Sequence, residues 1–379
     1  MSVNLLLVGA GGYAGEYLKR LLPSNDSVRL VGIVEPYYAT CVNKPAIDAA
    51  GIPVYATMEE FYAEHTADLA VICTPPFLHR EQSIFALSHG SYVLCEKPIA
   101  PTVEEAEAML AAEKRYGKWI AIGYQWSFSE AILSLKRDVM NGVLGAPVSF
   151  KTAISWPRNR AYYARGIGWG GKLVYNGLTV LDSIASNACA HYLHNMLFLL
   201  GRTLDTSAEA AAISGTCLRA NEIESFDTCA LEITAEDGTP LRFLASHACE
   251  KNCNPAFEYR FEKATVYYSE DEGSIIRATF NDGSERVYGD PFRDRMEKLF
   301  LCADAVRNGT TPVCTAKTAI PHTRLIGRLH REILIRDVDP ARIRVNPETD
   351  GVWVEGLLEE LYRAYEEDLP FGESFKNII

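Results

Sequence analysis

The sequence predicts an α/β protein with two domains: an N-terminal domain built on a doubly wound parallel sheet, and a C-terminal α+β domain with a large, mostly antiparallel, open-faced sheet. Three observations support this prediction. Short apolar runs alternate with helical segments over the first 125 residues, and a glycine-rich turn follows the first run. Later segments alternate apolar and polar residues, which is typical of a sheet with one buried face. We expect domains at 1–125 and 126–379, each large enough to bury its own core.

The glycine-rich turn has the form G-x-G-x-x-A and follows the apolar run Leu5–Val8. Apolar residues at helical spacing come after it, so the order is strand, glycine turn, helix, as in a Rossmann domain. Gly9 permits the tight turn, and Gly11 lets the backbone approach a pyrophosphate. The side chain of Ala14 is small, so the helix can pack closely on the strand. The helix N-terminus then offers free N–H groups to the anion.

An acidic residue stands where a ribose contact is expected. The second apolar run, Val28–Val34, ends at Glu35, 24 residues after Gly11, and roughly 20 is the usual separation. A carboxylate there binds the ribose hydroxyls and repels a 2′-phosphate, so NAD is favoured over NADP. The alternative is a glycine-rich turn in another kind of parallel α/β domain, with Glu35 a solvated strand end.

The remaining elements of the first half follow in alternation, and Glu105 three residues after Thr102 predicts a capping box. Ligands of such sheets bind at the carboxyl ends of the strands. Besides the glycine turn, two groups fall there: Thr74-Pro75-Pro76 with His79, and Glu96-Lys97-Pro98. The expected strands are Ile52–Tyr55, Leu69–Cys73, Tyr92–Cys95 and Trp119–Gly123, and the expected helices are Ile47–Gly51, Met58–His65, Phe77–His89 and the segment from Thr102 to Gly117.

The composition excludes several classes of function. A formal net charge of −12 argues against binding to nucleic acid or to an anionic membrane. The ten cysteines are scattered without C-x-x-C pairs, and we see neither a secretory segment nor an apolar run of ~18 residues. We therefore expect a cytoplasmic protein with reduced thiols and without a metal.

At Glu96-Lys97-Pro98 the chain resembles the Gfo/Idh/MocA oxidoreductases, the family of glucose–fructose oxidoreductase and inositol dehydrogenase. The resemblance covers nearly the whole length and rests on the glycine motif, on Cys73-Thr74-Pro75-Pro76 followed by His79, and on this triplet. It implies that Lys97 lies beside the nicotinamide and the reacting hydroxyl. The residues expected to bind the cofactor are Gly9, Gly11, Gly12, Tyr13, Ala14, Glu35, Thr74, Pro75, Pro76, His79, Glu96 and Lys97.

The chemistry of the lysine agrees with this position. Removing a hydride from an alcohol carbon is easier when a base takes the hydroxyl proton. A partly desolvated lysine beside the positively charged oxidised nicotinamide has its ammonium form disfavoured, so Lys97 can accept a proton near neutral pH. The alternative is an ordinary loop lysine paired with a carboxylate. For His79, a helix-capping role and a pocket role stay equally open.

The second half changes pattern after Tyr124. A helix is expected over Ser129–Asn141, and Asp237-Gly238 and Asn281-Asp282-Gly283 predict hairpin turns. The expected strands are Val148–Trp156, Ala210–Leu218, Thr228–Ile233, Leu241–His247 and Phe257–Tyr268, and the expected late helices are Phe292–Arg307, Thr318–Ile335 and Leu357–Tyr365. The resemblance implies that the exposed face of the sheet forms a subunit contact, so we expect a homo-oligomer, a dimer or tetramer.

The stretch Asn187–Met196 lines up with the family's D-x-G-x-H-x-x-D helix, and His191 falls on its catalytic histidine. On a helix, Asn187, His191 and His194 share one face. The resemblance thus implies that His191 shares proton transfer with Lys97, whereas Asn187 replaces an aspartate and only orients a hydroxyl. A core histidine is the alternative for His191. A metal site with Cys189 is disfavoured because Cys189 lies about 200° round the helix from His191.

A second group of residues suits a polyhydroxylated ring. Trp156, Arg158, Arg160, Tyr163 and Trp169 combine aromatic groups, which stack on apolar sugar faces, with guanidinium groups, which donate to hydroxyls or a carboxylate. We assign them, with His194, to the substrate, although such loops are equally common at subunit contacts. The intervening stretch Val174–Ser186 looks like an insertion.

We therefore predict an NAD-dependent oxidoreductase that transfers a hydride between nicotinamide and a secondary alcohol of a sugar, inositol or related polyol. One alternative keeps its NAD, oxidises a sugar ring, cleaves the glycosidic substituent and reduces the ring back. Another is a non-catalytic sensor of NAD or sugar. Intact Glu96-Lys97-Pro98 and His191 argue against the sensor.

Overall fold

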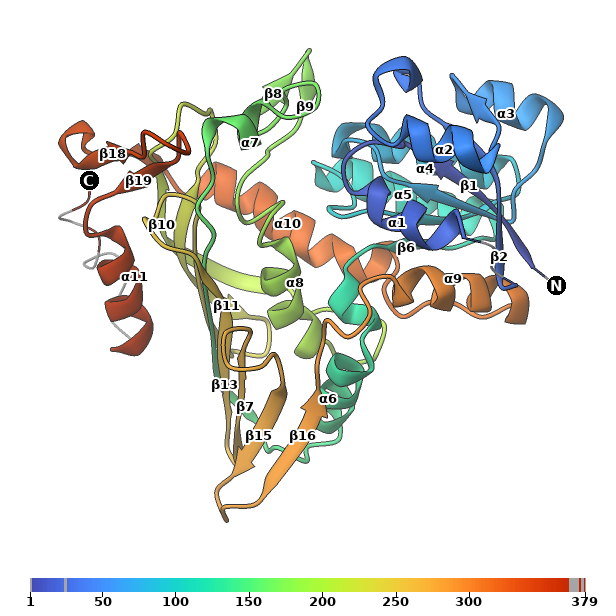
Figure 1. Cartoon of the computed structure of the whole chain (residues 1–379). Coiled ribbons are helices and arrows are strands. Elements are labelled where there is room, and N and C mark those ends of the chain that lie inside the picture. The colour runs from blue at the N-terminus through green and yellow to red at the C-terminus, as the bar shows by residue number, and fades with distance from the viewer. Residues whose placement is uncertain (1, 24–25, 368–374, 376–377, 379) are drawn as a thin grey trace. The chain divides into compact units, whose positions relative to one another are not determined.

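The computed structural model describes residues 2–23, 26–367, 375 and 378. The chain forms two compact units. The N-terminal unit consists of residues 1–128 and 294–320, and the C-terminal unit of residues 129–293 and 321–379 (Figure 1). Helix α9 and the start of helix α10 therefore return to the N-terminal unit after the chain has built most of the other.

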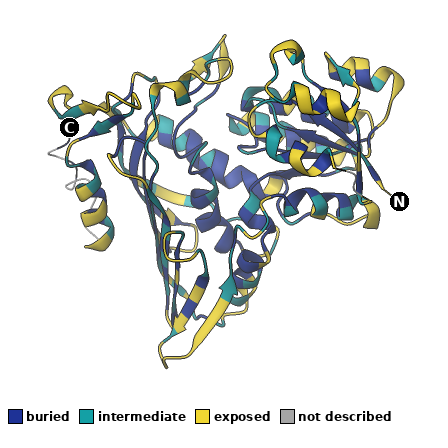
Figure 2. Ribbon diagram, in the orientation of Figure 1, coloured by how far each residue is buried: buried dark blue, intermediate teal, exposed yellow. Residues whose placement is uncertain are grey.

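The N-terminal unit is built on a six-stranded, all-parallel sheet with the order β3-β2-β1-β4-β5-β6. This is the strand order of a doubly wound Rossmann domain, so the predicted fold class is confirmed for this unit. The central strands β1 and β4 are buried at every residue except Asn4, and Figure 2 shows most of this sheet in dark blue. The strands are Val3–Val8, Val28–Val34, Val54–Tyr55, Leu69–Ile72, Tyr92–Cys95 and Ile120–Ile122, and the helices are α1 Ala14–Leu21, α2 Lys44–Ala50, α3 Met58–Glu64, α4 His79–Ser88, α5 Val103–Tyr116, α9 Glu297–Asn308 and α10 Ala316–Glu332.

The ends of α5 agree with the local sequence signals. The hydroxyl of Thr102 accepts a hydrogen bond from the Glu105 amide at 3.3 Å, so the predicted capping box is confirmed. Gly117 ends the helix in the left-handed region, with φ of 66°. A glycine adopts that conformation without steric cost, which is why the helix stops there.

The C-terminal unit is built on a nine-stranded sheet with the order β16-β15-β14-β13-β7-β12-β11-β10-β17. Most neighbours are antiparallel, and β7·β12 and β10·β17 are parallel pairs, so the expected mostly antiparallel sheet is confirmed. The strands are β7 Pro147–Ser155, β10 Ala210–Arg219, β11 Thr228–Ala235, β12 Pro240–Ser246, β13 Cys253–Phe261, β14 Ala264–Ser269, β15 Ile276–Phe280, β16 Glu285–Gly289 and β17 Ile335–Asp337.

One prediction for this sheet is wrong. The segment Phe257–Tyr268 is not one strand, because β13 ends at Phe261 and β14 begins at Ala264. The amides of Glu262 and Lys263 donate instead to the carbonyls of Ala146 and Leu144, at 3.0 and 2.9 Å. These bonds to another loop turn the chain back, and no local sequence pattern indicates them.

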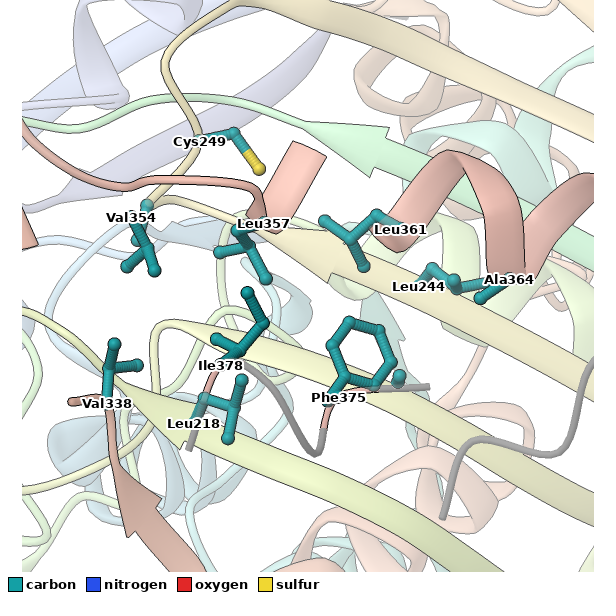
Figure 3. Close-up of a cluster of buried hydrophobic side chains, with 12 residues drawn as sticks. Leu218, Leu244, Cys249, Val338, Val354, Leu357, Leu361, Ala364, Phe375 and Ile378 are labelled. Atoms are coloured by element: carbon teal, nitrogen blue, oxygen red, sulfur yellow. The ribbon is translucent and has the colours of Figure 1, made fainter. Parts of the chain in front are cut away.

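The two faces of this sheet are covered differently (Figure 1). Helices α6 (Glu130–Met140), α8 (Ala190–Leu199) and the later part of α10 lie on one side, and α11 (Leu357–Glu366) lies on the other. Under α11 a buried cluster joins the helix to the sheet (Figure 3). Its members include Leu218, Leu244, Val338, Val354, Leu357, Leu361, Ala364, Phe375 and Ile378. Part of the face that we expected to be open is therefore covered by the chain's own C-terminal segment.

Three short elements complete the C-terminal unit. Helix α7 spans Arg160–Ala164, the hairpin β8–β9 spans Val174–Tyr175 and Leu178–Thr179, and a second small pair is formed by β18 (Ile343–Val345) and β19 (Val352–Val354). The hairpin occupies the first part, residues 174–179, of the stretch that looked like an insertion. Its tip has the conformation that Asn-Gly favours, since φ is positive at both Asn176 and Gly177.

Candidate functional site

The glycine turn leaves space and hydrogen-bond donors at the start of α1. A Cβ on Gly9 would lie 3.1 Å from the Cys73 carbonyl oxygen, and φ is +86°, so only glycine fits. A Cβ on Gly11 or Gly12 would meet no atom within 4 Å, so open space lies there. Within the described residues, the amides of Gly11, Gly12 and Tyr13 make no hydrogen bond. Free amides and open space at a helix N-terminus fit a pyrophosphate.

Glu35 is held beside this turn by the backbone. Its two carboxylate oxygens accept hydrogen bonds from the amides of Ala10 and Tyr37, each at 2.9 Å. The residue follows directly on β2, at the carboxyl edge of the sheet. Each oxygen keeps a second lone pair, so the carboxylate can still accept the two hydroxyls of a ribose. The residues present therefore fit the adenosine half of NAD.

His79 links the other two predicted turns. Its Nδ1 lies 2.9 Å from the Pro98 carbonyl oxygen and its Nε2 lies 2.8 Å from that of Thr74. The ring is buried, and burial lowers its pKa, so the neutral form, which donates from one nitrogen at a time, is favoured. Because both nitrogens face backbone carbonyls, His79 positions the two turns, and the structure does not support the direct cofactor contact that we expected.

Glu96 lies at the centre of a buried charged network. Its Oε1 accepts hydrogen bonds from the Tyr17 hydroxyl at 2.7 Å and from the Lys298 ammonium at 2.5 Å. The side chain of Lys298 is 0% exposed and that of Glu96 is 9% exposed. Lys298 also donates to the Gly123 carbonyl oxygen at 3.2 Å. A Cβ on Gly123 would lie 2.8 Å from the Glu96 carboxyl group, so this contact requires glycine.

The network joins the glycine turn to the turn that contains Lys97. The Lys298 ammonium lies 4.8 Å from the centre of the Tyr13 ring, and the Tyr13 hydroxyl donates to Gln125 at 3.1 Å. On the other side, the Lys97 amide donates to Glu96 Oε2 at 3.3 Å. Lys97 itself is partly buried. Sequence reasoning missed Lys298, since a lysine in an amphipathic helix normally faces solvent.

In the C-terminal unit, Asn187 is not on the predicted helix, because α8 begins only at Ala190. The hydroxyl of Ser186 accepts from the Ser183 amide at 2.8 Å, and the Asn187 side chain donates to Asp182 at 2.9 Å. Such side-chain bonds compete with helix formation. The shared helix face that we expected for Asn187 and the two histidines is therefore wrong. Asp182, which also accepts from the Gly171 amide at 2.6 Å, was missed.

The two histidines of α8 lie in different surroundings. His191 is in the first turn and is partly buried. His194 is buried, with its ring 5.8 Å from that of Phe198 and 6.3 Å from that of His322. Burial, together with the nearby His322 and Lys136, lowers the pKa of His194 well below its usual value. This placement indicates a neutral core histidine and does not support the substrate contact that we expected.

The aromatic and arginine residues that we expected to contact the substrate lie near one another, except Arg160. The guanidinium of Arg158 lies against the rings of Trp156 and Tyr162, at 5.8 and 4.9 Å. Trp169 lies near Arg165, and Tyr163 is next to Tyr162 with its ring at 5.2 Å. Arg160 differs, because it is exposed and pairs with Glu222 at 3.7 Å and Asp350 at 3.4 Å.

The described residues contain neither a metal-ligand cluster nor a membrane-spanning helix. In the described part of the chain, no group of three or more His, Cys, Asp or Glu side chains could hold a metal ion. Among the same residues, no helix is both long enough and apolar enough to cross a bilayer.

Comparison with known proteins identifies the first unit. Residues 3–124 match the family model GFO_IDH_MocA, described as an oxidoreductase family with an NAD-binding Rossmann fold. Residues 3–124 form a Gfo/Idh/MocA NAD-binding domain. The resemblance seen in the glycine turn and in Glu96-Lys97-Pro98 is thereby confirmed, and so is NAD as the cofactor of this family.

Curated relatives match less than half of this chain. A 2,7-anhydro-N-acetylneuraminate hydratase of Mediterraneibacter gnavus is 26% identical over 144 residues, 38% of this chain and 37% of that protein. An inositol 2-dehydrogenase of Renibacterium salmoninarum is 28% identical over 145 residues, 38% of this chain and 43% of that protein. The chain thus spans less than half the length of these relatives.

Solved structures extend the likeness in fold beyond the Gfo/Idh/MocA domain. The WlbA dehydrogenase from Bordetella pertussis, in complex with NADH and UDP-GlcNAcA, has a TM-score of 0.70 and 19% identity, over 87% of this chain and 96% of that one. The aldose–aldose oxidoreductase from Caulobacter crescentus has a TM-score of 0.71 and 20% identity, over 87% and 97%. At these identities the comparison shows that the fold is shared.

Proposed function

We propose that this protein is an NAD-dependent oxidoreductase acting on a secondary alcohol of a sugar, inositol or related polyol. The main support is the pairing of unbonded amides at the glycine turn with the fixed carboxylate of Glu35, at the edge of the sheet where Lys97 also lies. A carboxylate at that point repels a 2′-phosphate, so we propose NAD rather than NADP as the preferred form.

NAD, held by the glycine turn and Glu35, would supply the acceptor for the hydride of the alcohol carbon. Lys97 takes the hydroxyl proton, and the Glu96–Lys298 pair keeps the turn that contains it in place. We also propose that His191, which lies in the C-terminal unit, takes part in the proton transfer. Asn187 cannot act as an acid or base, so we assign it to orienting a second hydroxyl through its amide, which Asp182 fixes.

The cofactor proposal is tested by titrating the protein with NADH and with NADPH and following nicotinamide fluorescence. We expect NADH to bind more tightly, and Glu35→Ser to weaken NADH binding by about 10- to 100-fold, since a charged hydrogen-bond acceptor is lost. Glu59→Gln, an exposed carboxylate on α3, is the matched control. Equal affinity of the wild type for both cofactors would contradict the assignment of Glu35.

The catalytic proposal is tested with a panel of polyols and NAD. Lys97→Ala should lower kcat by about 10²- to 10⁴-fold, the usual contribution of a positioned base, and leave NADH binding nearly unchanged. Lys19→Ala, an exposed lysine on α1, is the control. Undiminished turnover in Lys97→Ala would refute the role of Lys97, whatever the affinity for NADH.

A second candidate activity is cleavage of a glycoside with retention of the cofactor. Asn187, which cannot exchange protons, precedes α8 and is bonded to Asp182, so the usual acid–base pairing with His191 is altered. This activity predicts that NAD copurifies and that a glycoside is cleaved without net formation of NADH. A sensor, by contrast, would bind NADH and turn over no sugar.

We also propose a cytoplasmic homo-oligomer, a dimer or tetramer that uses the sheet of the C-terminal unit. Since α11 covers the apolar part of one face, the contact would use the strands beyond it, where Tyr267 on β14 is exposed. Light scattering of the wild type and of Tyr267→Asp tests this contact. A monomeric wild type would refute it.

A further inference from the structure

We propose that Arg158 and Arg165 form a subsite for an oxyanion, so that the substrate is a sugar or polyol carrying a carboxylate or phosphate group. The inference rests on the proposed function and names its substrate class. Every residue used lies in the C-terminal unit. Both guanidinium groups pack against the ring of Tyr162, with Cζ 4.9 Å and 3.6 Å from its centre.

Arg158 is partly buried, and its charge has no acidic partner among the described residues. Within the same residues, its guanidinium makes one hydrogen bond, from a terminal nitrogen to the Pro157 carbonyl oxygen at a long 3.4 Å. Its Nε is buried and makes no hydrogen bond. A buried guanidinium donor without an acceptor is costly, and it is normally compensated by a carboxylate or phosphate. Arg158 therefore has donors available for an anion.

Arg165, which is more exposed than Arg158, also lacks an acidic partner among the described residues. It donates to the Tyr162 carbonyl oxygen and lies 5.8 Å from the centre of the Trp169 ring, and it forms no ion pair with the residues that the structure describes. Two aromatic rings and a backbone bond thus fix its direction without neutralising its charge. A guanidinium presents a planar fork of donors that matches carboxylate and phosphate oxygens.

Other cations of the same region are paired. Arg160 has Glu222 and Asp350 within 4 Å, and Lys172 lies 3.9 Å from Glu224. The chain carries an excess of acidic residues, with a net charge of −12, so carboxylates are plentiful. Among the described residues, neither arginine on Tyr162 has a carboxylate of this kind.

His247 also packs against the ring of Tyr162. Its ring lies 5.5 Å from that of Tyr162, and its Nδ1 is 2.7 Å from the Trp156 carbonyl oxygen. Burial, and then the charges of Arg158 and Arg165, lower the pKa of His247 to about 3. The histidine therefore stays neutral at physiological pH and does not compete with the arginines for the anion.

The surrounding groups suit the rest of a sugar. The Tyr163 hydroxyl is buried without a partner, so it can donate to a sugar hydroxyl. A small hollow lies beside it, lined also by Tyr162, Asp182 and His247. Gly170 packs closely on the backbone of Tyr163, since a Cβ on Gly170 would lie 2.7 Å from the Tyr163 carbonyl oxygen.

The test measures binding by calorimetry to the NADH-loaded protein, with matched sugars: glucose, glucuronate and glucose 6-phosphate, and the corresponding galactose series. We expect at least one anionic sugar to bind about 10- to 100-fold more tightly than its neutral counterpart, with the preference decreasing at high salt. Tighter binding of the sugar acids identifies a carboxylate, and tighter binding of the phosphates identifies a phosphoryl group.

The variants are Arg158→Met and Arg165→Met, with Arg137→Met as control, an exposed arginine paired with Glu130 outside this region. Each of the first two should abolish the preference for anions and leave the affinity for neutral sugars within about 3-fold. Arg158→Lys should retain only part of the preference for anions, because lysine lacks the planar fork of donors. Equal binding of charged and neutral sugars, no binding of either, or a preference that survives both variants would overturn the inference. NADH binding is measured first, because a protein that does not bind NADH would contradict the proposed function itself and not only the anion subsite.

Discussion

The two units each place cations against tyrosine rings, with opposite arrangements of charge. In the N-terminal unit, Lys298 lies over Tyr13 and Tyr17 and is neutralised by Glu96. In the C-terminal unit, Arg158 and Arg165 lie against Tyr162, and neither pairs with a carboxylate that the structure describes. The first cation is completely buried, whereas Arg165 is exposed.

The difference distinguishes a charge that holds the fold from a charge that is available to a ligand. Removing one partner of a buried ion pair leaves the other charge desolvated, which typically costs about 3–5 kcal/mol. Removing an exposed side chain usually changes stability by no more than about 0.5 kcal/mol. The comparison therefore predicts that the Glu96–Lys298 pair affects mainly stability, and that the arginines affect mainly binding.

The largest expected effect is that of Lys298→Met. It leaves the Glu96 carboxylate buried without its cation, so the free energy of unfolding in urea should decrease by about 3–5 kcal/mol. Combining it with Glu96→Gln removes both charges and should recover part of the loss. Lys19→Met, at an exposed lysine, should change stability by less than about 0.5 kcal/mol. A loss below about 1 kcal/mol for Lys298→Met would contradict the structural role of the pair.

Local signals explain why much of the N-terminal unit could be predicted. The glycine turn, the strand that ends before Glu35 and the Thr102 cap each depend on residues close in sequence. Parallel topology then brings the strand ends to one edge. The turns at Asp237-Gly238 and Asn281-Asp282-Gly283 were predictable for the same reason, since they directly join β11 to β12 and β15 to β16.

What could not be predicted depends on contacts between distant residues. Lys298 bonds to a carboxylate 202 positions earlier in the chain, and residues 294–320 join a unit whose other part ends at 128. Asn187 falls before α8 because Asp182 and the serines bond to its surroundings. The apparent strand Phe257–Tyr268 is divided by bonds to the carbonyls of Leu144 and Ala146. None of these partners is visible in a local pattern.

The pH dependence of stability tests the potential around the arginines. Since the pKa of His247 is about 3 in the folded protein and about 6.5 when unfolded, the unfolded chain binds more protons between these values. The free energy of unfolding should therefore fall as pH decreases through this window. In the wild type the free energy of unfolding in urea should be higher at pH 7 than at pH 4. We expect His247→Gln to decrease that difference by about 2–3 kcal/mol.

Arg158→Met removes one of the charges that lower this pKa, so it should raise the pKa of His247 and flatten the same profile slightly. His89→Gln, at an exposed histidine of the N-terminal unit, is the control and should leave the slope nearly unchanged. An identical profile in wild type and His247→Gln would show that the ring is protonated in the folded state as readily as in the unfolded one.

The smallest expected effect is that of Arg165→Met on stability. The side chain is exposed and makes a cation–π contact with Tyr162, which at exposed sites contributes about 0.5–1 kcal/mol. Unfolding in urea at pH 8, where His247 is neutral, should therefore differ from wild type by less than about 1 kcal/mol. A decrease of more than about 2 kcal/mol in the free energy of unfolding would mean that Arg165 stabilises its loop, as Lys298 stabilises the N-terminal turns. The distinction between a structural charge and one left for a ligand would then fail at the residue where it should be clearest.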